Sequence, residues 1–132
     1  MEPWVSPLPL LASRVSAGFP SPADDHIETQ LDLNRYLIKH PAATFFMRVA
    51  GDSMQGVGIH SGDLLVVDRS LDPCDGSVVV AVVNGDLTVK ILRRSSQILA
   101  LQAANRNYPT LVIQDHMDFQ VWGVVTAAIH YV

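Results

Sequence analysis

From Thr44 to the end of the chain, short apolar or alternating segments follow one another, each closed by turn residues. They comprise residues 45–50, 64–67, 78–83, 87–92, 98–101, 111–113 and 119–125, and residues 129–132 can add a last one. Strands at spacings of about ten residues are typical of a β-sandwich or a partly open barrel. Asn84-Gly85 between two segments predicts a two-residue hairpin. The pattern therefore predicts a mainly β, compact domain.

The segment before this domain has a different composition. Five of the eight prolines lie within the first 22 residues. Because proline fixes φ and lacks a backbone donor, residues 1–26 are expected to form an extended, weakly anchored arm. Asp32 is expected to cap one short helix, Leu33–His40, with Lys39 at its end and Pro41 after it. The predicted division is 1–41 for the arm with its helix and 42–132 for the β domain.

Composition and charge exclude several classes of protein. With 48% hydrophobic and 17% charged residues, the 132-residue chain can bury a core. A net charge of −4 argues against binding nucleic acid mainly through its phosphates, and no sequence-specific binding is expected. No apolar run is long enough for a membrane helix. The apolar stretch near the N-terminus follows Glu2 and is interrupted by prolines, so we expect a cytoplasmic protein without a secretory leader.

The residues that hold metals and cofactors do not gather in the sequence. A single cysteine, Cys74, excludes an intramolecular disulfide. The five histidines are scattered without the close spacing of a zinc site. Most aspartates lie in turns, where they are expected to be structural, and no glycine-rich loop precedes a helix. No metal and no cofactor are expected.

Lysine is rare in this chain, and one of its two lysines has an unusual setting. Lys90 lies within Leu87–Leu92, a segment that is apolar on one face and nearly apolar on the other. Desolvation there would lower the pKa of the amine and allow it to act as a general base. Alternatively, Lys90 lies on the exposed face of an edge strand and extends its amine into water. The residues alone leave both interpretations open.

Gly51-Asp52-Ser53-Met54 follows the first predicted strand of the β domain. These residues fit an ordinary turn. They also fit a turn that exposes a serine hydroxyl and directs backbone N–H groups to one point, as an oxyanion hole requires. No histidine–aspartate pair has the spacing of a conventional triad, so a serine served by a lysine is the remaining arrangement for acyl transfer.

Taken together, these motifs resemble the LexA/UmuD family of Ser-Lys self-cleaving peptidases. The match consists of Gly51–Met54, Ser61–Asp68 and Gly85–Leu92 in this order, with the candidate serine and lysine 37 residues apart (90 − 53). Ala17–Ala23 resembles the self-cleavage region of the UmuD-like members, and Asp32–Asn34 and His40-Pro41 are also UmuD-like. The resemblance extends from Gly18 to Val125.

The resemblance implies a role for each matching residue. Ser53 would be the nucleophile, Lys90 the general base, and the Ser53 backbone N–H part of the oxyanion hole. The scissile bond would be Ala17–Gly18, with Val15 and Phe19 as flanking side chains in the active-site groove. Whether the arm is cut in cis or in trans stays open.

The resemblance also implies a cellular role in the SOS DNA-damage response. Self-cleavage would be stimulated by the RecA–single-stranded DNA filament, and the trimmed homodimer would serve a UmuC-like translesion polymerase, with no role for a membrane. A LexA repressor itself is not expected, because about 16 residues before the cleavage site cannot form a helix-turn-helix unit. The alternative is a non-catalytic dimeric binding module of the same fold that acts on a polymerase.

Overall fold

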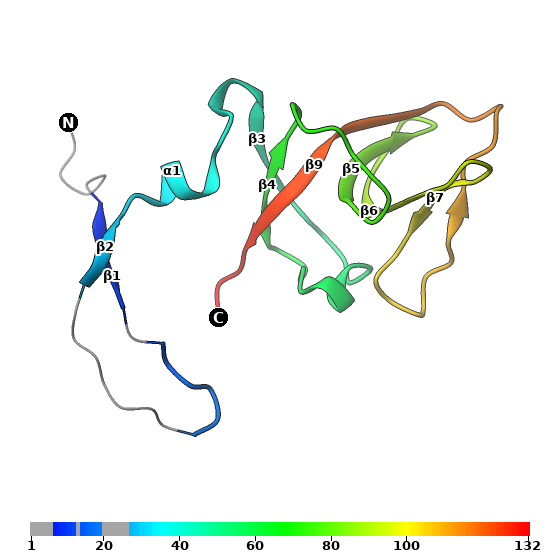
Figure 1. Ribbon diagram of the computed structural model, residues 1–132. Coiled ribbons are helices and arrows are strands. Elements are labelled where there is room, and N and C mark those ends of the chain that lie inside the picture. Colours follow the sequence, from blue (N-terminus) through cyan, green and yellow to red (C-terminus); the bar gives the residue numbers. More distant parts are fainter. Residues whose placement is uncertain (1–6, 13, 20–26) are drawn as a thin grey trace. The chain divides into compact units, whose positions relative to one another are not determined.

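The computed structural model describes residues 7–12, 14–19 and 27–132. The chain divides into two units, Met1–Lys39 and His40–Val132, and each is described by itself (Figure 1). Part of the segment that resembles a self-cleavage region, Pro20–Ala23, lies outside the described residues. No helix among the described residues is long and apolar enough to cross a bilayer.

The first unit contains a ribbon that the proline content did not predict. Strand β1 (Leu8–Leu11) pairs antiparallel with β2 (Ile27–Leu31), and Pro9 lies opposite Gln30. The backbone of β1 is extended, as expected, but it is anchored by its pairing with β2, which differs from the expected weakly anchored arm. In a two-stranded ribbon each strand directs every other N–H away from its partner, so a proline can be accommodated without the loss of a ladder hydrogen bond.

The short helix begins where the sequence predicts and ends earlier. Asp32 caps helix α1 (Leu33–Leu37), because its Oδ1 accepts from the backbone N–H groups of Asn34 at 3.1 Å and Arg35 at 3.4 Å. The predicted end at His40 is wrong: Ile38 is already extended, and Lys39 lies beyond the helix. Non-helical backbone at His40 leads instead into a 3-10 turn, η2 (Pro41–Ala43). The restriction that Pro41 places on its predecessor disfavours helical backbone at His40.

The second unit is built on one antiparallel seven-stranded sheet, which confirms the predicted mainly β fold. Its strands are β3 (Thr44–Arg48), β4 (Leu64–Asp68), β5 (Val78–Val83), β6 (Asp86–Arg94), β7 (Leu99–Gln102), β8 (Leu111–Val112) and β9 (Phe119–Ile129). The strand order is β3-β4-β9-β5-β6-β7-β8. Asn84 and Gly85 adopt φ values of 50° and 87° in the β5–β6 turn, as the predicted hairpin requires.

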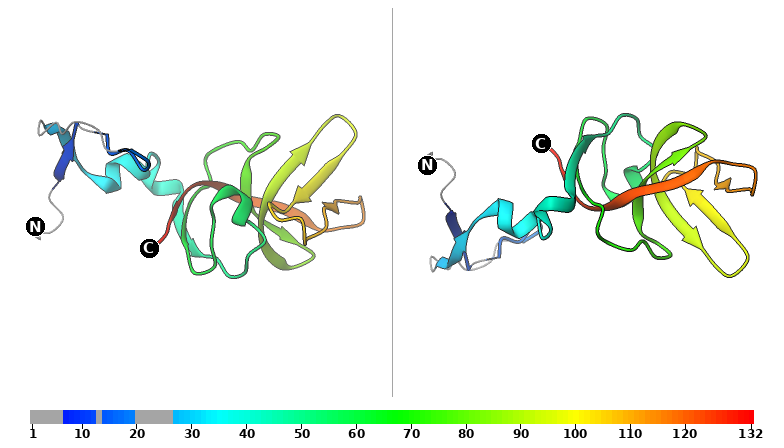
Figure 2. Two further views of the ribbon diagram at one scale, coloured as in Figure 1. Left: turned by 90° about the horizontal axis from the view of Figure 1, so that it is seen from below. Right: turned by 90° about the horizontal axis from the view of Figure 1, so that it is seen from above.

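Strand β9 joins the two halves of this sheet. It pairs with β5 through Phe119–Val124 and with β4 through Val124–Ile129, and Figure 2 shows it running across the unit. The two segments expected at 119–125 and 129–132 are therefore one strand that ends at Ile129. The register of β9 shifts opposite Val66/Val67 of β4 and opposite Val80/Ala81 of β5. These irregularities allow β9 to pair with both strands.

The core lies on both faces of β5, which explains its unbroken run of small and β-branched residues. Val80 packs into one cluster and Val79 into the other. The first cluster consists of Met54, Ile59, Leu65, Val67 and Val80, and the second of Val79, Ala81, Val83, Leu92 and Leu101. A strand buried on both faces has a fixed register. It therefore holds the neighbouring β6 rigidly.

Two of the aspartates expected in turns are buried and paired with histidines. Asp63 is 2% exposed and accepts from the His60 backbone N–H and from His130 Nδ1, whereas Asp68 accepts from Ser70 and from His40 Nδ1. These hydrogen bonds stabilise the ionised carboxylates and lower the pKa of each below its ordinary value. Their role is structural, as the sequence predicted.

Candidate active site

Ser53 lies in a turn that leaves the sheet at the end of β3. Gly51 adopts a φ of 91°, which favours glycine, and its N–H donates to Ser61 Oγ at 3.1 Å. The side chain of Met54 is buried in the first core cluster. Since one neighbour of Ser53 is fixed in the core, the half-buried serine is held at the surface of the domain.

Lys90 lies on β6, where it pairs with Val79 of β5, and the pairing of β6 with β7 begins at the next residue, Ile91. The side chain is half-buried and its amine donates to Thr88 Oγ1, so the interpretation of an amine that extends into water is wrong. Burial disfavours the charged amine and lowers the pKa of Lys90 below its ordinary value. In the part of the chain that the structure describes, no carboxylate lies within ion-pair distance of the amine to oppose this shift.

The structure brings the two candidate residues together across 37 positions of sequence. Lys90 Nζ lies 3.2 Å from Ser53 Oγ, within hydrogen-bonding distance. Nζ also donates to Thr88 Oγ1 at 2.8 Å. Thr88 and Lys90 lie two positions apart on one strand, so their side chains share a face. Thr88 thus holds the amine beside the serine hydroxyl.

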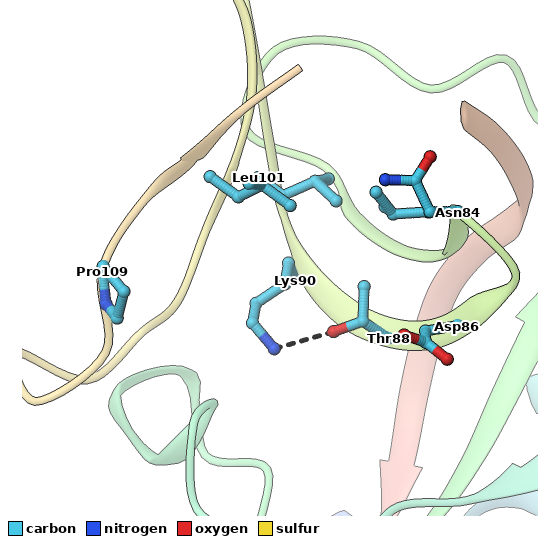
Figure 3. Close-up of a pocket in the computed structure, with 8 residues that line it drawn as sticks. Asn84, Asp86, Thr88, Lys90, Leu101 and Pro109 are labelled. Atoms are coloured by element: carbon cyan, nitrogen blue, oxygen red, sulfur yellow. Dashed lines mark hydrogen bonds between the residues drawn. The ribbon is translucent and has the colours of Figure 1, made fainter. Parts of the chain in front are cut away.

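A pocket of about 280 Å³ opens beside Lys90. Figure 3 shows Lys90 and Thr88 directed into it from β6, with Pro109 across from them. Its lining also includes Val83, Asn84, Asp86, Leu101 and Leu111. This mixture of apolar and polar groups suits an extended peptide, whose side chains and backbone need both kinds of contact.

The turn also presents backbone donors. Within residues 27–132 and the shorter described segments, the N–H groups of Ser53 and Met54 donate to no protein acceptor. Two neighbouring free N–H groups beside a serine hydroxyl are what an oxyanion hole requires. The predicted role of the Ser53 N–H thus has a geometric basis, and it stays a prediction.

The residues predicted at the cleavage site belong to the first unit. The chain bends at Ala17–Phe19, where Gly18 N donates to Ser16 Oγ at 3.3 Å. Val15 and Phe19 are 93% and 89% exposed, so neither side chain is packed within its unit. The assignment of Ala17–Gly18 as the scissile bond stays a prediction.

Some residues of the site were not singled out from the sequence. Thr88 could have been found from strand alternation, because it shares a face with Lys90. Asn105 and Tyr108 contact Asp52 from 53 and 56 residues away, and no local pattern indicates this contact. As for metals, the described residues contain no group of three histidine, cysteine or carboxylate side chains able to hold an ion.

The fold and the site together define a β domain with a serine hydroxyl beside a desolvated lysine amine. A comparison with known protein families also identifies a peptidase. Residues 9–126 match the family described as Peptidase S24-like. Since the match covers most of the chain, the protein belongs to this peptidase family.

Comparison with individual proteins narrows the class. The chain is 51% identical to protein SamA of Salmonella typhimurium over 98% of its own length and 89% of that protein. It is 46% identical to protein ImpA of Escherichia coli over 92% of the chain and 83% of that protein. The LexA repressor of Sodalis glossinidius is 44% identical over 82% of the chain, but only 52% of the repressor is covered. The chain is a UmuD-like member of the LexA/UmuD family.

Proposed function

We propose that this protein is a self-cleaving serine peptidase that uses a Ser53–Lys90 dyad to cut its own arm at Ala17–Gly18. The observation that supports this most directly is the 3.2 Å distance between Ser53 Oγ and Lys90 Nζ. The lowered pKa of Lys90 adds to it, because only a neutral amine can accept the serine proton. Membership of the peptidase family is consistent with both.

The reaction follows from these groups. Neutral Lys90 takes the proton of the Ser53 hydroxyl while Ser53 Oγ attacks the Ala17 carbonyl carbon. The Ser53 and Met54 N–H groups stabilise the oxyanion that forms. The lysine then donates its proton to the leaving Gly18 amine, and water hydrolyses the acyl-enzyme. Val15 and Phe19, on either side of the bond, would occupy the groove beside Lys90.

The cellular role that we propose is in the SOS response to DNA damage. A RecA–single-stranded DNA filament stimulates the cleavage, and the trimmed protein serves as accessory subunit of a UmuC-like translesion polymerase in the cytoplasm. This proposal rests on the UmuD-like relationship.

Self-cleavage without a partner is expected at alkaline pH. The rate should rise as Lys90 loses its proton and should level off once the amine is neutral. Because burial lowers the pKa of Lys90, this rise should begin below the ordinary lysine value of about 10.4. Intact mass measured across a pH series would detect a fragment that begins at Gly18. Its absence at every alkaline pH would contradict the peptidase proposal and favour a non-catalytic binding module.

A homodimer is expected at micromolar concentration. The second unit exposes large apolar side chains on and after β9, including Trp122, Ile129 and the 92% exposed Tyr131. Large apolar side chains left exposed on one strand can contribute to an interface with a second copy, and the UmuD-like relationship supports a homodimer. Light scattering would measure the mass, and a monomeric mass across this range would contradict the expectation.

The dimer raises the question of which subunit cuts which arm. Cleavage in cis and in trans can be separated by mixing two variants. One is Ser53→Ala, which has no nucleophile, and the other keeps Ser53 but has its cleavage site blocked, for example by Gly18→Pro. Cleavage of the Ser53→Ala arm requires action in trans. Its complete resistance confines each arm to its own active site.

A further inference from the structure

The turn that carries Ser53 is tied to a distant loop, residues 103–109, between β7 and β8. Asn105 Nδ2 donates to the Asp52 carbonyl oxygen at 3.0 Å, and the Tyr108 hydroxyl donates to Asp52 Oδ1. Both the backbone and the side chain of the residue before Ser53 are therefore held from outside the turn.

A third contact holds the other side of Ser53. Gly56 N donates to the Ala104 carbonyl oxygen at 2.7 Å. A Cβ at position 56 would lie 2.6 Å from that oxygen, closer than atoms can approach, so the two backbones meet only because residue 56 is glycine. The loop thus contacts the turn on both sides of the serine.

Asn105, which donates to the Asp52 carbonyl oxygen, also orders the loop itself. Asn105 Oδ1 accepts from Asn107 N at 3.0 Å, while its amide nitrogen donates to Asp52. Tyr108 N donates to the Asn105 carbonyl oxygen at 3.2 Å. One asparagine side chain therefore folds the loop and fastens it to the serine turn.

The need for such a fastening follows from where the two reacting groups lie. Lys90 is on a strand of the sheet, where it pairs with Val79 of β5, and Thr88 fixes its amine. Ser53 is on a turn outside the sheet, so its position relative to the amine depends on contacts of the turn. A displacement of about 1 Å would break the 3.2 Å contact and can cost about a hundredfold in rate.

We propose that Asn105 and Tyr108 are positioning residues, which act through Asp52 to hold the Ser53 hydroxyl against Lys90. This inference rests on the proposed function and adds to it two residues that touch neither the scissile bond nor the amine. The loop then determines how much of the time Ser53 Oγ lies within hydrogen-bonding distance of Lys90 Nζ, which the attack on the scissile bond requires.

The titration of Tyr108 suits this role. Its hydrogen bond to Asp52 and the nearby negative charge raise the pKa of the phenol above its ordinary value. Burial lowers the pKa of Lys90. The two shifts are in opposite directions, so one favours the neutral amine and the other favours the protonated phenol that donates to Asp52.

Tyr108→Phe removes only the hydroxyl and is the sharpest test. The cleavage rate at the alkaline plateau should fall about tenfold, because the turn samples other positions. The midpoint of the pH–rate profile should not move, because the surroundings of Lys90 are unchanged. Tyr36→Phe is the matched control, since that ring is 61% exposed and lies on α1, away from the turn and the loop in sequence, and it should cleave at the wild-type rate.

A double-mutant cycle separates positioning from a general loss of stability. Asp52→Ala should slow cleavage as Tyr108→Phe does, and the double variant should be no slower than Asp52→Ala alone. Asp52→Asn keeps an acceptor for the phenol and should be faster than Asp52→Ala. Independent, multiplicative losses in the double variant would overturn the proposal.

The positioning role of Asn105 and Tyr108 and the proposed self-cleavage can be contradicted independently of each other. If wild-type protein and Tyr108→Phe cleave equally fast, positioning is wrong and self-cleavage stands. If the wild type does not cleave, amide hydrogen exchange of residues 52–56 decides. Faster exchange in Tyr108→Phe than in Tyr36→Phe supports the fastening, and equal exchange overturns it.

Discussion

Replacing Ser53 with alanine is expected to abolish the fragment that begins at Gly18 at every pH. The hydroxyl is the group that attacks in the proposed mechanism, and water at the same place lacks its fixed position. The fold should be retained, because Ser53 lies in a turn and is half-buried, and its hydroxyl bonds only to Lys90 among the described residues. Intact mass after alkaline incubation measures the first effect and thermal unfolding the second.

The control for this variant is Ser96→Ala, which removes the hydroxyl of an exposed serine between β6 and β7. It should cleave at the wild-type rate. If Ser53→Ala produced the fragment as fast as Ser96→Ala does, Ser53 would have no part in the reaction.

Substitution of Lys90 is expected to have an equally large effect for a different reason. Lys90→Ala removes the base. Lys90→Arg keeps a cation that stays protonated throughout the accessible pH range and therefore cannot accept the serine proton. Neither variant should cleave, and raising the pH should not restore activity to Lys90→Arg. The same mass assay across the pH series measures this.

Lys90→Ala should also change how stability depends on pH. The folded-state pKa of Lys90 lies below its unfolded value, so the unfolded chain binds more protons between the two, and this residue's contribution to stability rises with pH in that window. Any stabilisation by Lys90→Ala should thus be largest near neutral pH and disappear toward about pH 10.4.

Lys39→Arg, at the only other lysine, is the control for the cleavage assay of the Lys90 variants. Cleavage by Lys90→Arg at the control's rate would remove the lysine from the mechanism.

Features set by neighbouring residues were predictable from the sequence. Apolar alternation located the strands of the β domain, Asn84-Gly85 specified the hairpin between β5 and β6, and Asp32 marked the start of α1. Each of these depends on contacts within a few residues, or on one face of a strand meeting the core.

Features set by pairing partners were not predictable in this way. The prolines predicted an extended, weakly anchored arm, and the pairing of its residues Leu8–Leu11 with Ile27–Leu31 was not foreseen. Strand β9 reads as two segments because different halves of it pair with β5 and β4. The Ser53–Lys90 pair was expected only through the family resemblance, since the residues alone also fit an ordinary turn and an exposed lysine on an edge strand. Tyr108 gave no signal, because its partner Asp52 lies in a distant part of the sequence.

The position of Ser53 on a turn after β3 and of Lys90 on β6 has a consequence for the order of protein synthesis. The arm with Ala17 and Gly18 leaves the ribosome first, and Ser53 follows, yet the amine that must activate it belongs to β6. Strand β6 is held between β5 and β7, and β5 in turn pairs with β9, near the end of the chain. Under the proposed mechanism, a growing chain is thus inert toward its own arm until nearly all of it has been translated and folded. Under this mechanism, the sheet topology delays trimming until β9 has been made and paired with β5.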